Sequence, residues 1–187
     1  MRVIAGSAKG RTLVAPKGTV TRPATDRVRE TLFAILEPRL PDARVLDLFA
    51  GAGTLGIEAL SRGAVHATFV ERATAALAAL QTNLRATGFE DRAEVARTNV
   101  LAFLERRIDD PYDTVFCDPP FADVAVLEAV LARLPTAGAL HDDSIVVARV
   151  LRKHRPVLPA RAALTRVKEI GEEDLLFLRY DAAGGGG

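Results

Sequence analysis

The stretch Val45-Leu46-Asp47-Leu48-Phe49-Ala50-Gly51-Ala52-Gly53-Thr54-Leu55-Gly56 decides the fold. It starts as a short apolar strand, turns through glycines that match the pattern G-x-G-x-x-G, and continues as a predicted helix that ends at Gly63. Glu71 follows 20 residues after Gly51, at the end of the next predicted strand. A strand, a glycine turn, a helix and an acidic residue at the second strand tip are typical of a nucleotide-binding α/β sheet.

The ligand of this turn is either a dinucleotide or S-adenosylmethionine. Both use glycines for close backbone approach and a strand-tip carboxylate for the ribose hydroxyls. Asp47 distinguishes them, because an acid just before the turn is unfavourable beside a pyrophosphate and favourable near a sulfonium or an ammonium group. The sequence therefore favours S-adenosylmethionine, and it favours a ligand of either kind over a glycine turn that binds nothing.

Strands and helices alternate on both sides of the turn, which implies parallel strands with helices on both faces. Two further strands, joined by a short turn, indicate a C-terminal antiparallel hairpin. We predict a Rossmann-like, mostly parallel seven-stranded sheet, preceded by a helix from Asp26 and a small N-terminal β-hairpin extension. The predicted strands are 45–49, 67–70, 94–96, 112–117, 144–150, 163–170 and 175–180, the helices of the sheet are 54–62, 74–87, 100–107 and 124–134, and the N-terminal hairpin is 2–6 with 11–14.

Asp118-Pro119-Pro120-Phe121 follows the fourth predicted strand, at the edge where open parallel sheets bind ligands. The prolines stiffen the turn and leave carbonyls without competing N–H groups nearby. Asp118 and the Pro119 carbonyl can accept hydrogen bonds from an exocyclic base amine, and Phe121 can stack on the base. Such motifs are similar to those of methyltransferases acting on adenine N6, cytosine N4 or guanine N2. A Pro-Pro turn alone is common, so the meaning of the motif depends on the upstream glycine turn and Glu71.

Two other kinds of chemistry are disfavoured. Cys117, the single cysteine, precedes Asp118 in a strand, so its side chain should point to the opposite side, into the packing, rather than act as a nucleophile. The histidines, His66, His141 and His154, are scattered without metal-ligand spacing, so we expect no metal.

Size and composition fit one globular domain. The chain has 187 residues, of which 49% are hydrophobic and 26% charged, and this length needs no disulfide or structural metal to hold a core. A single cysteine, the absence of a leader-like segment and the absence of an apolar run of about 20 residues indicate a cytoplasmic protein without a membrane span. We expect a monomer.

Basic residues are concentrated in two segments, although the net charge is only +1. Residues 1–40 hold eight Lys or Arg and three Asp or Glu, a net charge of +5, and residues 149–168 hold seven Lys or Arg and no acid. Such segregation suggests a polyanionic partner, because each neutralised phosphate releases a counterion. A solvated basic face is the alternative that charge alone leaves open.

Several stretches of the chain resemble the RsmD family of bacterial ribosomal RNA methyltransferases. The resemblance covers nearly the whole chain and implies the fold of class I S-adenosylmethionine-dependent methyltransferases. It also implies methylation of guanine N2 in 16S ribosomal RNA of the small subunit or its assembly intermediate. The stretches are Ile4-Ala5-Gly6, Lys9-Gly10-Arg11, Arg22-Pro23-Ala24-Thr25-Asp26-Arg27-Val28-Arg29-Glu30, Asp47-Leu48-Phe49-Ala50-Gly51-Ala52-Gly53, Gly56-Ile57-Glu58-Ala59-Leu60-Ser61-Arg62-Gly63-Ala64 and Asp118-Pro119-Pro120-Phe121.

The resemblance further implies roles for individual residues. Asp47 and the glycines would line the methionine end of the cofactor, Glu71 would hold the ribose, and Asn99 would meet the adenine. The complete sets are Asp47, Phe49, Gly51, Gly53, Glu71, Arg72, Asn99 and Val100 for the cofactor, Asp118, Pro119, Pro120 and Phe121 for the target guanine, and Lys9, Arg11, Arg22, Thr25, Arg27 and Arg29 for the RNA.

The basic segment, the α/β body and the four C-terminal glycines divide the chain into an RNA-facing basic extension of residues 1–40, a methyltransferase domain of residues 41–181 and a flexible tail of residues 182–187. Three positions depart from the family pattern. Thr is more frequent at Ala24, Asn is usual at Ala34, and Tyr is commoner at Phe121. Phe still stacks, whereas Ala34 puts in doubt a polar contact from the helix to the substrate.

The sequence leaves open two other functions for the chain and another role for one of its arginines. An adenine-N6 methyltransferase of RNA or DNA would use the same turn, but the chain has no added target-recognition domain. A non-enzymatic RNA-binding protein would not need the glycine turn, Glu71 and the Asp118 turn together. Arg27 and Arg29 lie on different faces of the predicted helix, so one of them can be a structural ion pair with an acid of the body.

Overall fold

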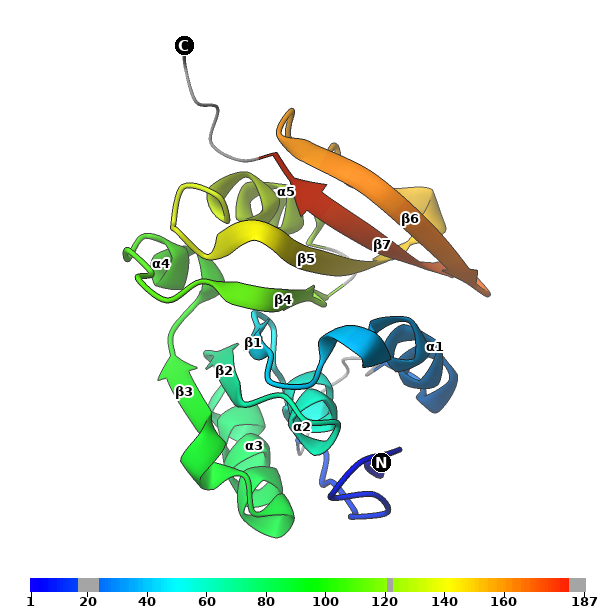
Figure 1. Cartoon of the computed structure of the whole chain (residues 1–187), viewed down its shortest axis with the longest axis vertical. Helices are drawn as coiled ribbons and strands as arrows, with labels where there is room; N and C mark the ends of the chain where they lie inside the picture. The colour runs from blue at the N-terminus through cyan, green and yellow to red at the C-terminus, as the bar shows by residue number, and fades with distance from the viewer. Residues whose placement is uncertain (17–23, 121–122, 182–187) are drawn as a thin grey trace.

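The computed structural model describes residues 1–16, 24–120 and 123–181. Within these residues one seven-stranded sheet has the order β3-β2-β1-β4-β5-β7-β6 (Figure 1). Strands β1 to β5 are parallel, whereas β7 is antiparallel to β5 and β6 is antiparallel to β7. The predicted sheet, mostly parallel with a C-terminal antiparallel hairpin, is confirmed. The strands are β1 (Arg44–Asp47), β2 (His66–Glu71), β3 (Ala93–Arg97), β4 (Tyr112–Cys117), β5 (Leu140–Leu151), β6 (Ala162–Ile170) and β7 (Glu173–Tyr180).

Helices cover both faces of the sheet (Figure 1). One apolar cluster joins the sheet to α1, α2 and α3, and a second joins it to α4 and α5. Among the described residues, no helix is both long and apolar enough to cross a bilayer. The helices are α1 (Asp26–Leu36), α2 (Thr54–Ser61), α3 (Thr74–Thr87), α4 (Val100–Leu104) and α5 (Val124–Arg133), with 3-10 turns η1 (Glu37–Arg39), η2 (Glu90–Arg92) and η3 (Arg152–His154).

Two elements of the sheet and its helices, α4 and β5, differ from the prediction by more than two residues at one end. α4 ends at Leu104, earlier than the predicted residue 107, and β5 begins at Leu140 rather than at Ser144. Leu140 pairs with Tyr112 across a shift in register, and the Ser144 hydroxyl donates to the Tyr112 carbonyl. Pairing with β4, rather than hydrophobic alternation, therefore determines where β5 begins.

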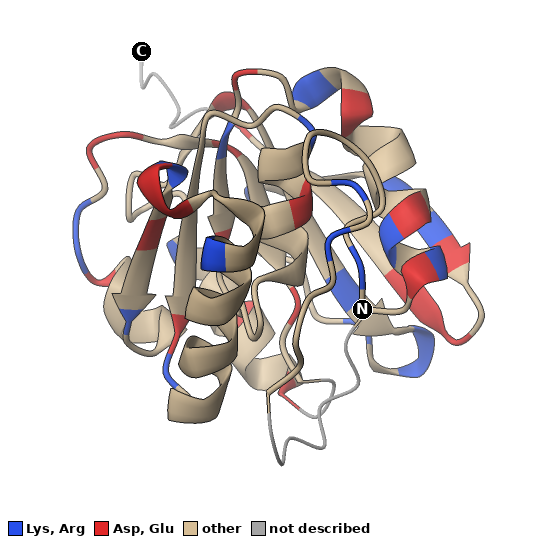
Figure 2. Ribbon diagram, turned by 90° about the horizontal axis from the view of Figure 1, so that it is seen from below, with Lys and Arg blue, Asp and Glu red and all other residues tan. Residues whose placement is uncertain are grey.

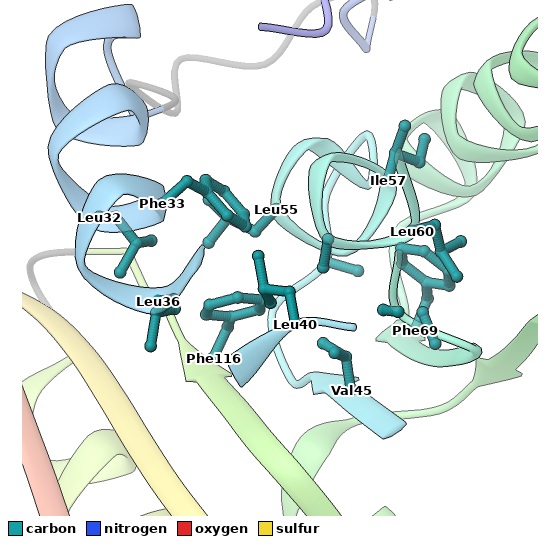
Figure 3. Packing of buried hydrophobic residues seen from close by; sticks show 14 of the residues in the cluster. Leu32, Phe33, Leu36, Leu40, Val45, Leu55, Ile57, Leu60, Phe69 and Phe116 are labelled. Carbon is teal, nitrogen blue, oxygen red and sulfur yellow. The ribbon is translucent and has the colours of Figure 1, made fainter. Parts of the chain in front are cut away.

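Apolar side chains fix α1 to the sheet beside the end of β4. Phe33 on α1 and Phe116 on β4 are in edge-to-face contact, with ring centroids 5.8 Å apart. Leu36 and Leu40 are also fully buried in this cluster (Figure 3). The contact orients α1 next to the turn that follows β4.

The start of the chain pairs over a shorter stretch than the predicted hairpin of 2–6 with 11–14: the Val3 N–H donates to the Arg11 carbonyl at 3.0 Å and the Leu13 N–H to the Met1 carbonyl at 2.8 Å. Arg2 and Thr12 make one isolated antiparallel bridge. The N–H groups of Ile4 and Ala5 instead donate to the two carboxylate oxygens of Glu58 on α2, at 2.8 and 3.0 Å. A buried side chain thus takes the amides of the two residues that follow the paired stretch.

Gly6 lets this part of the chain lie directly on α2. Its φ is 81°, and a Cβ there would lie 1.7 Å from the Ser61 carbonyl oxygen. The Ala8 N–H donates to the Ser61 hydroxyl at 3.0 Å, while Val3 and Leu13 join the apolar cluster under α1 and α2. Residues 1–16 therefore pack onto the same core as the sheet.

Candidate active site

Four of the predicted site residues meet at the carboxyl edge of the sheet because their strands are neighbours. Asn99 follows β3, Glu71 ends β2, Asp47 ends β1 and Asp118 follows β4. Adjacent strands lie about 4.8 Å apart, so the row from β3 to β4 spans about 14 Å. That length suits an extended nucleoside with an amino-acid tail.

The turn between β1 and α2 uses glycines in the left-handed conformation. Gly51 has φ of 53° and Gly53 has φ of 81°. A Cβ at Gly53 would lie 2.3 Å from Leu80, whereas a Cβ at Gly51 would meet no described atom within 4 Å. Asn83 on α3 braces the turn by donating to the Ala52 carbonyl at 2.9 Å. The turn is therefore packed against α3, while the space beside Gly51 is open, as close approach of a ligand to the backbone requires.

Glu71 lies beside this turn with both carboxylate oxygens oriented by backbone amides. Its Oε2 accepts the Gly51 N–H at 2.9 Å, and its Oε1 accepts the N–H groups of Arg72 and Ala73, each at 2.7 Å. A carboxylate has about four lone-pair positions, so acceptor capacity remains. The half-buried side chain is thus oriented to receive hydroxyl donors of a ribose.

Asp47 is a buried acid with an unmet hydrogen-bonding atom. Its exposure is 1%, its Oδ2 accepts the Gly56 N–H at 3.1 Å, and its Oδ1 has no partner among the described residues. Burial raises the pKa of Asp47 to about 7, and the carboxylates of Asp118 and Glu71 add to the rise. A cation beside Oδ1 would offset both costs. The residue therefore fits the cationic methionine end of S-adenosylmethionine and does not fit a pyrophosphate.

The remaining predicted cofactor residues lie along the same edge. Asn99 caps α4, because its Oδ1 accepts the Ala102 N–H at 2.9 Å. Val100 is buried, Phe49 is half-buried and the Arg72 side chain is exposed. All eight residues predicted for the cofactor are thus brought to one edge of the sheet.

Asp118 is held by a buried arginine that the sequence analysis missed. Arg149 on β5 donates from Nε to Asp118 Oδ1 at 2.6 Å and from a terminal nitrogen to Glu173 Oε2 at 3.1 Å. Burial raises the pKa of Asp118, and the Arg149 charge opposes that rise. An arginine inside the otherwise apolar run Ile145-Val146-Val147-Ala148-Arg149-Val150 is the signal that could have found it.

A groove opens beside Asp118 between α1 and the sheet. Of the Asp118 turn, Pro119 is buried and Pro120 is exposed, and Phe121 lies outside the described residues. The groove is lined mostly by apolar side chains, together with the ion pair of Asp118 and Arg149. Its other lining residues include Ala24, Val28, Leu32, Val147 and Leu175.

Arg29, predicted to contact RNA, is fully buried. It donates to the Arg2 carbonyl at 2.9 Å and to Asp26 at 2.8 Å, and it lies 3.8 Å from Glu58. The prediction of an RNA contact does not fit this burial. Of the two helix arginines, Arg29 is the structural ion pair, because its face of α1 packs against α2 and the start of the chain.

The other predicted RNA residues have varied surroundings. Lys9, Arg11 and Arg27 are exposed, and Arg22 lies outside the described residues. Thr25 caps α1, since its hydroxyl accepts the Val28 N–H at 3.3 Å. The ribbon in Figure 2 shows basic and acidic positions interleaved along the same elements.

Cys117 packs in the apolar cluster between the sheet and α4 and α5, and burial raises its thiol pKa. This environment opposes a nucleophilic thiolate. In the part of the chain that the structure describes, no group of three His, Cys, Asp or Glu side chains is arranged to hold a metal ion.

The strand order, the glycine turn and the carboxylates at successive strand tips define the fold of class I S-adenosylmethionine-dependent methyltransferases. The family described as Conserved hypothetical protein 95 matches residues 1–179. The chain is 40% identical over 185 residues to Ribosomal RNA small subunit methyltransferase D of Escherichia coli strain K12, covering 98% of this chain and 92% of that protein. It belongs to the RsmD family of S-adenosylmethionine-dependent ribosomal RNA methyltransferases.

Solved structures agree with this assignment. The Escherichia coli protein yhhF has a TM-score of 0.86 and 39% identity, with 97% of this chain and 98% of that chain covered. A more distant chain, crystallised as a complex with S-adenosylhomocysteine, has a TM-score of 0.65 and 14% identity over 81% of this chain and 49% of that chain, which shows a shared fold. The predicted family, enzyme class and cofactor are confirmed by the family assignment.

Proposed function

We propose that this protein transfers a methyl group from S-adenosylmethionine to the exocyclic N2 of a guanine in 16S ribosomal RNA of the small ribosomal subunit. The observation that carries the proposal is the Asp118 turn, which follows β4 directly beside Asp47 at the end of β1. A base held by this turn would lie next to the methionine end of the cofactor. The identity of 40% to the Escherichia coli small-subunit RNA methyltransferase supports the choice of substrate.

The cofactor would be held by the row of strand-tip residues. When bound, S-adenosylmethionine supplies an electrophilic methyl group on a positively charged sulfur. Asp47 would face the cationic methionine end through its unpaired Oδ1, Glu71 would accept the ribose hydroxyls, and Asn99 with Val100 would border the adenine. These residues stand at the ends of neighbouring strands, β3, β2 and β1, or directly after them.

The target base would be held by Asp118, Pro119, Pro120 and Phe121. Asp118 and the Pro119 carbonyl would accept the two hydrogens of the amine and draw its lone pair out of conjugation with the ring. As N2 bonds to the methyl carbon, the bond between that carbon and the cofactor's sulfur would break, with its electron pair staying on sulfur. N2 would lose one proton, and a carboxylate already hydrogen-bonded to that proton can receive it. Phe121 would stack on the base, so the chemistry depends mainly on positioning.

The RNA backbone would be contacted by Lys9, Arg11, Arg22 and Arg27, in an extension of residues 1–40 that precedes a methyltransferase domain of residues 41–181 and a tail of residues 182–187. A paired guanine would have to leave its stack to reach the turn, so we expect a loop or flipped base as the target. The protein would act as a monomer in the cytoplasm, on an assembled or assembling subunit.

Transfer of labelled methyl groups to small ribosomal subunits that lack base methylation tests the proposal. Nuclease digestion would then identify the modified nucleoside. We expect N2-methylguanosine, and N6-methyladenosine would keep the fold and the chemistry but overturn the substrate. Asp118→Ala should abolish transfer while RNA binding survives, and continued turnover by this variant would remove Asp118 from the site.

Cofactor binding provides a separate test. Glu71→Ala should weaken S-adenosylmethionine binding by about 2 kcal/mol, roughly 30-fold, because it removes a charged acceptor. Calorimetric titration measures the affinity. An affinity equal to that of the wild-type protein would exclude Glu71 from the ribose site.

Asp47 gives a pH-dependent readout that needs no substrate. Its pKa in the folded protein, about 7, lies above the value of an unfolded aspartate, about 3.9. The folded state therefore loses stability as the pH rises from the lower value to the higher one. Asp47→Asn removes this loss and should stabilise the cofactor-free protein by about 4 kcal/mol at pH 8, with little gain at pH 4. A stability difference independent of pH, measured by urea denaturation, would contradict the raised pKa.

A further inference from the structure

Arg149 is buried between two carboxylates beside the proposed acceptor site. The exposure of its side chain is 7%, compared with 14% for Asp118 and 10% for Glu173. Its planar guanidinium donates in two fixed directions, to Asp118 after β4 and to Glu173 on β7. The orientation of the Asp118 carboxylate is therefore set by side chains from two other strands.

The charges around Asp118 make Arg149 decisive for its ionisation. Burial and the charge of Glu173 raise the pKa of Asp118, whereas Arg149 lowers it. Asp47 on β1 is close enough for its own pKa to rise in response to Asp118, and the neighbouring Cys117 is uncharged because burial raises its pKa. Among these described side chains Arg149 is the one cation, so without it Asp118 would be a buried acid among like charges.

We propose that Arg149 is a positioning residue that orients the Asp118 carboxylate and keeps it ionised, so that the site accepts guanine and rejects adenine. The inference rests on the proposed function, since it concerns the base that Asp118 receives. Arg149 would act only through Asp118, without contacting the reacting atoms.

The selection follows from the edges of the two bases. Guanine presents N1–H and an N2–H side by side, and an ionised carboxylate accepts both. Adenine presents an N6–H beside N1, which is an acceptor, so a carboxylate lone pair would face the lone pair of N1. A protonated acid could donate to adenine N1, which means that the protonation state of Asp118 determines the preferred base.

Titration of the Asp118 carboxyl group by carbon-13 NMR tests the electrostatic part of the proposal, with Asp118→Asn used to assign the signal. Arg149→Gln should raise the pKa of Asp118 by about one unit or more, because it removes an adjacent positive charge. Glu173→Gln should move the pKa in the opposite direction, because it removes a negative charge. A merely structural disturbance would not produce shifts of opposite sign.

Two further variants separate charge, orientation and general damage. Arg149→Lys keeps the charge but not the planar fork, so the titration should stay near that of the wild-type protein while methyl transfer falls at least tenfold. Arg152→Gln is the matched control, because Arg152 pairs with Glu169 and Asp174 rather than with Asp118. It should leave the Asp118 titration unchanged.

The same variants are then compared in methyl transfer to small ribosomal subunits as a function of pH. The acid limb of the rate profile should move upward in Arg149→Gln by the same amount as the titration. An unshifted titration in folded Arg149→Gln, or a shifted titration with an unshifted acid limb, would overturn the proposal. Absence of any RNA methylation by the wild-type protein would instead overturn the proposed function and guanine selection with it, while the titration would still report whether Arg149 keeps Asp118 ionised.

Discussion

The two basic regions of the chain, residues 1–40 and 149–168, have different surroundings in the fold. In the first region, the side chains of Lys9, Arg11 and Arg27 are exposed. In the second, three arginines pair with acids that β7 supplies. The acids follow the second region closely in the sequence and return beside it as an antiparallel strand.

The acids of β7 that neutralise these arginines are buried in the sheet. Asp174 is fully buried and lies 3.2 Å from Arg152 and 2.7 Å from Arg155, and Glu173 receives Arg149 at 3.1 Å. A basic run in a sequence therefore does not make a basic surface by itself, because its counter-charges can lie on the next strand. The comparison favours the first region as the RNA-facing one.

The largest effect is expected at Arg29, the buried exception within the first region. Arg29→Ala should lower the free energy of unfolding by about 3 kcal/mol, because Glu58 stays buried after losing one of its cationic neighbours. Arg27→Ala, two positions earlier and exposed, is the matched control and should change it by less than about 0.5 kcal/mol. Equal losses in urea denaturation would contradict the distinction between the two arginines.

A smaller loss of stability is expected in the second region. Asp174→Ala removes the carboxylate shared by Arg152 and Arg155, whose side chains are 45% and 41% exposed and can be solvated instead. We expect a loss of about 1–2 kcal/mol in urea denaturation. Asp142→Ala, an exposed acid on β5, should have almost no effect, and a similar result for Asp174→Ala would show that the shared pairing does not stabilise the fold.

RNA binding should respond to the exposed residues of the first region. Replacing Lys9, Arg11 and Arg27 together by Ala should reduce the slope of log affinity against log salt by about 2, since each phosphate contact contributes about 0.7–0.9. Filter binding of 16S ribosomal RNA between low and moderate salt measures the slope. A slope unchanged by the triple substitution would exclude these residues from phosphate contact.

The smallest effect is expected for the exposed basic residues of the second region. Arg166 and Lys168 lie on β6 at the edge of the sheet and are exposed, where basic residues also protect against strand pairing between molecules. Replacing both by Ala should change the salt slope by less than about 0.5. A reduction as large as that of the triple substitution would mean that both regions contact RNA.

Local patterns in the sequence were sufficient to predict the order of strands and helices. They were also sufficient to place the proposed cofactor residues at the ends of neighbouring strands. Parallel strands bring their carboxyl ends to one edge, so Asp47, Glu71 and Asp118 could be grouped from their positions along the chain. Pairings over long sequence separations could not be predicted, because alternation does not identify a partner. The N–H group of Ile4, for example, donates to Glu58, 54 residues away, where the local pattern indicated that the hairpin continues.

The same limit explains the missed arginine and the misassigned one. Arg149 meets Asp118 across 31 residues and Glu173 across 24, and neither separation has a signature in the sequence. Arg29 occupies a helix position whose exposure depends on where α2 packs. In both cases the sequence gives the charge of a residue, whereas the packing of other elements determines whether that charge reaches solvent.

The position of β7 has a consequence for the order in which the protein is completed during synthesis. A chain leaves the ribosome with its N-terminus first, so β5 and β6 emerge before β7, yet β7 lies between them in the sheet. Until β7 inserts, β6 lacks its pairing strand and Arg149 lacks Glu173. The fold thus couples the arrangement of the Asp118 turn to the arrival of its seventh strand, and a nascent chain that ends before residue 173 would carry the proposed cofactor residues without Glu173, the partner of Arg149 on β7.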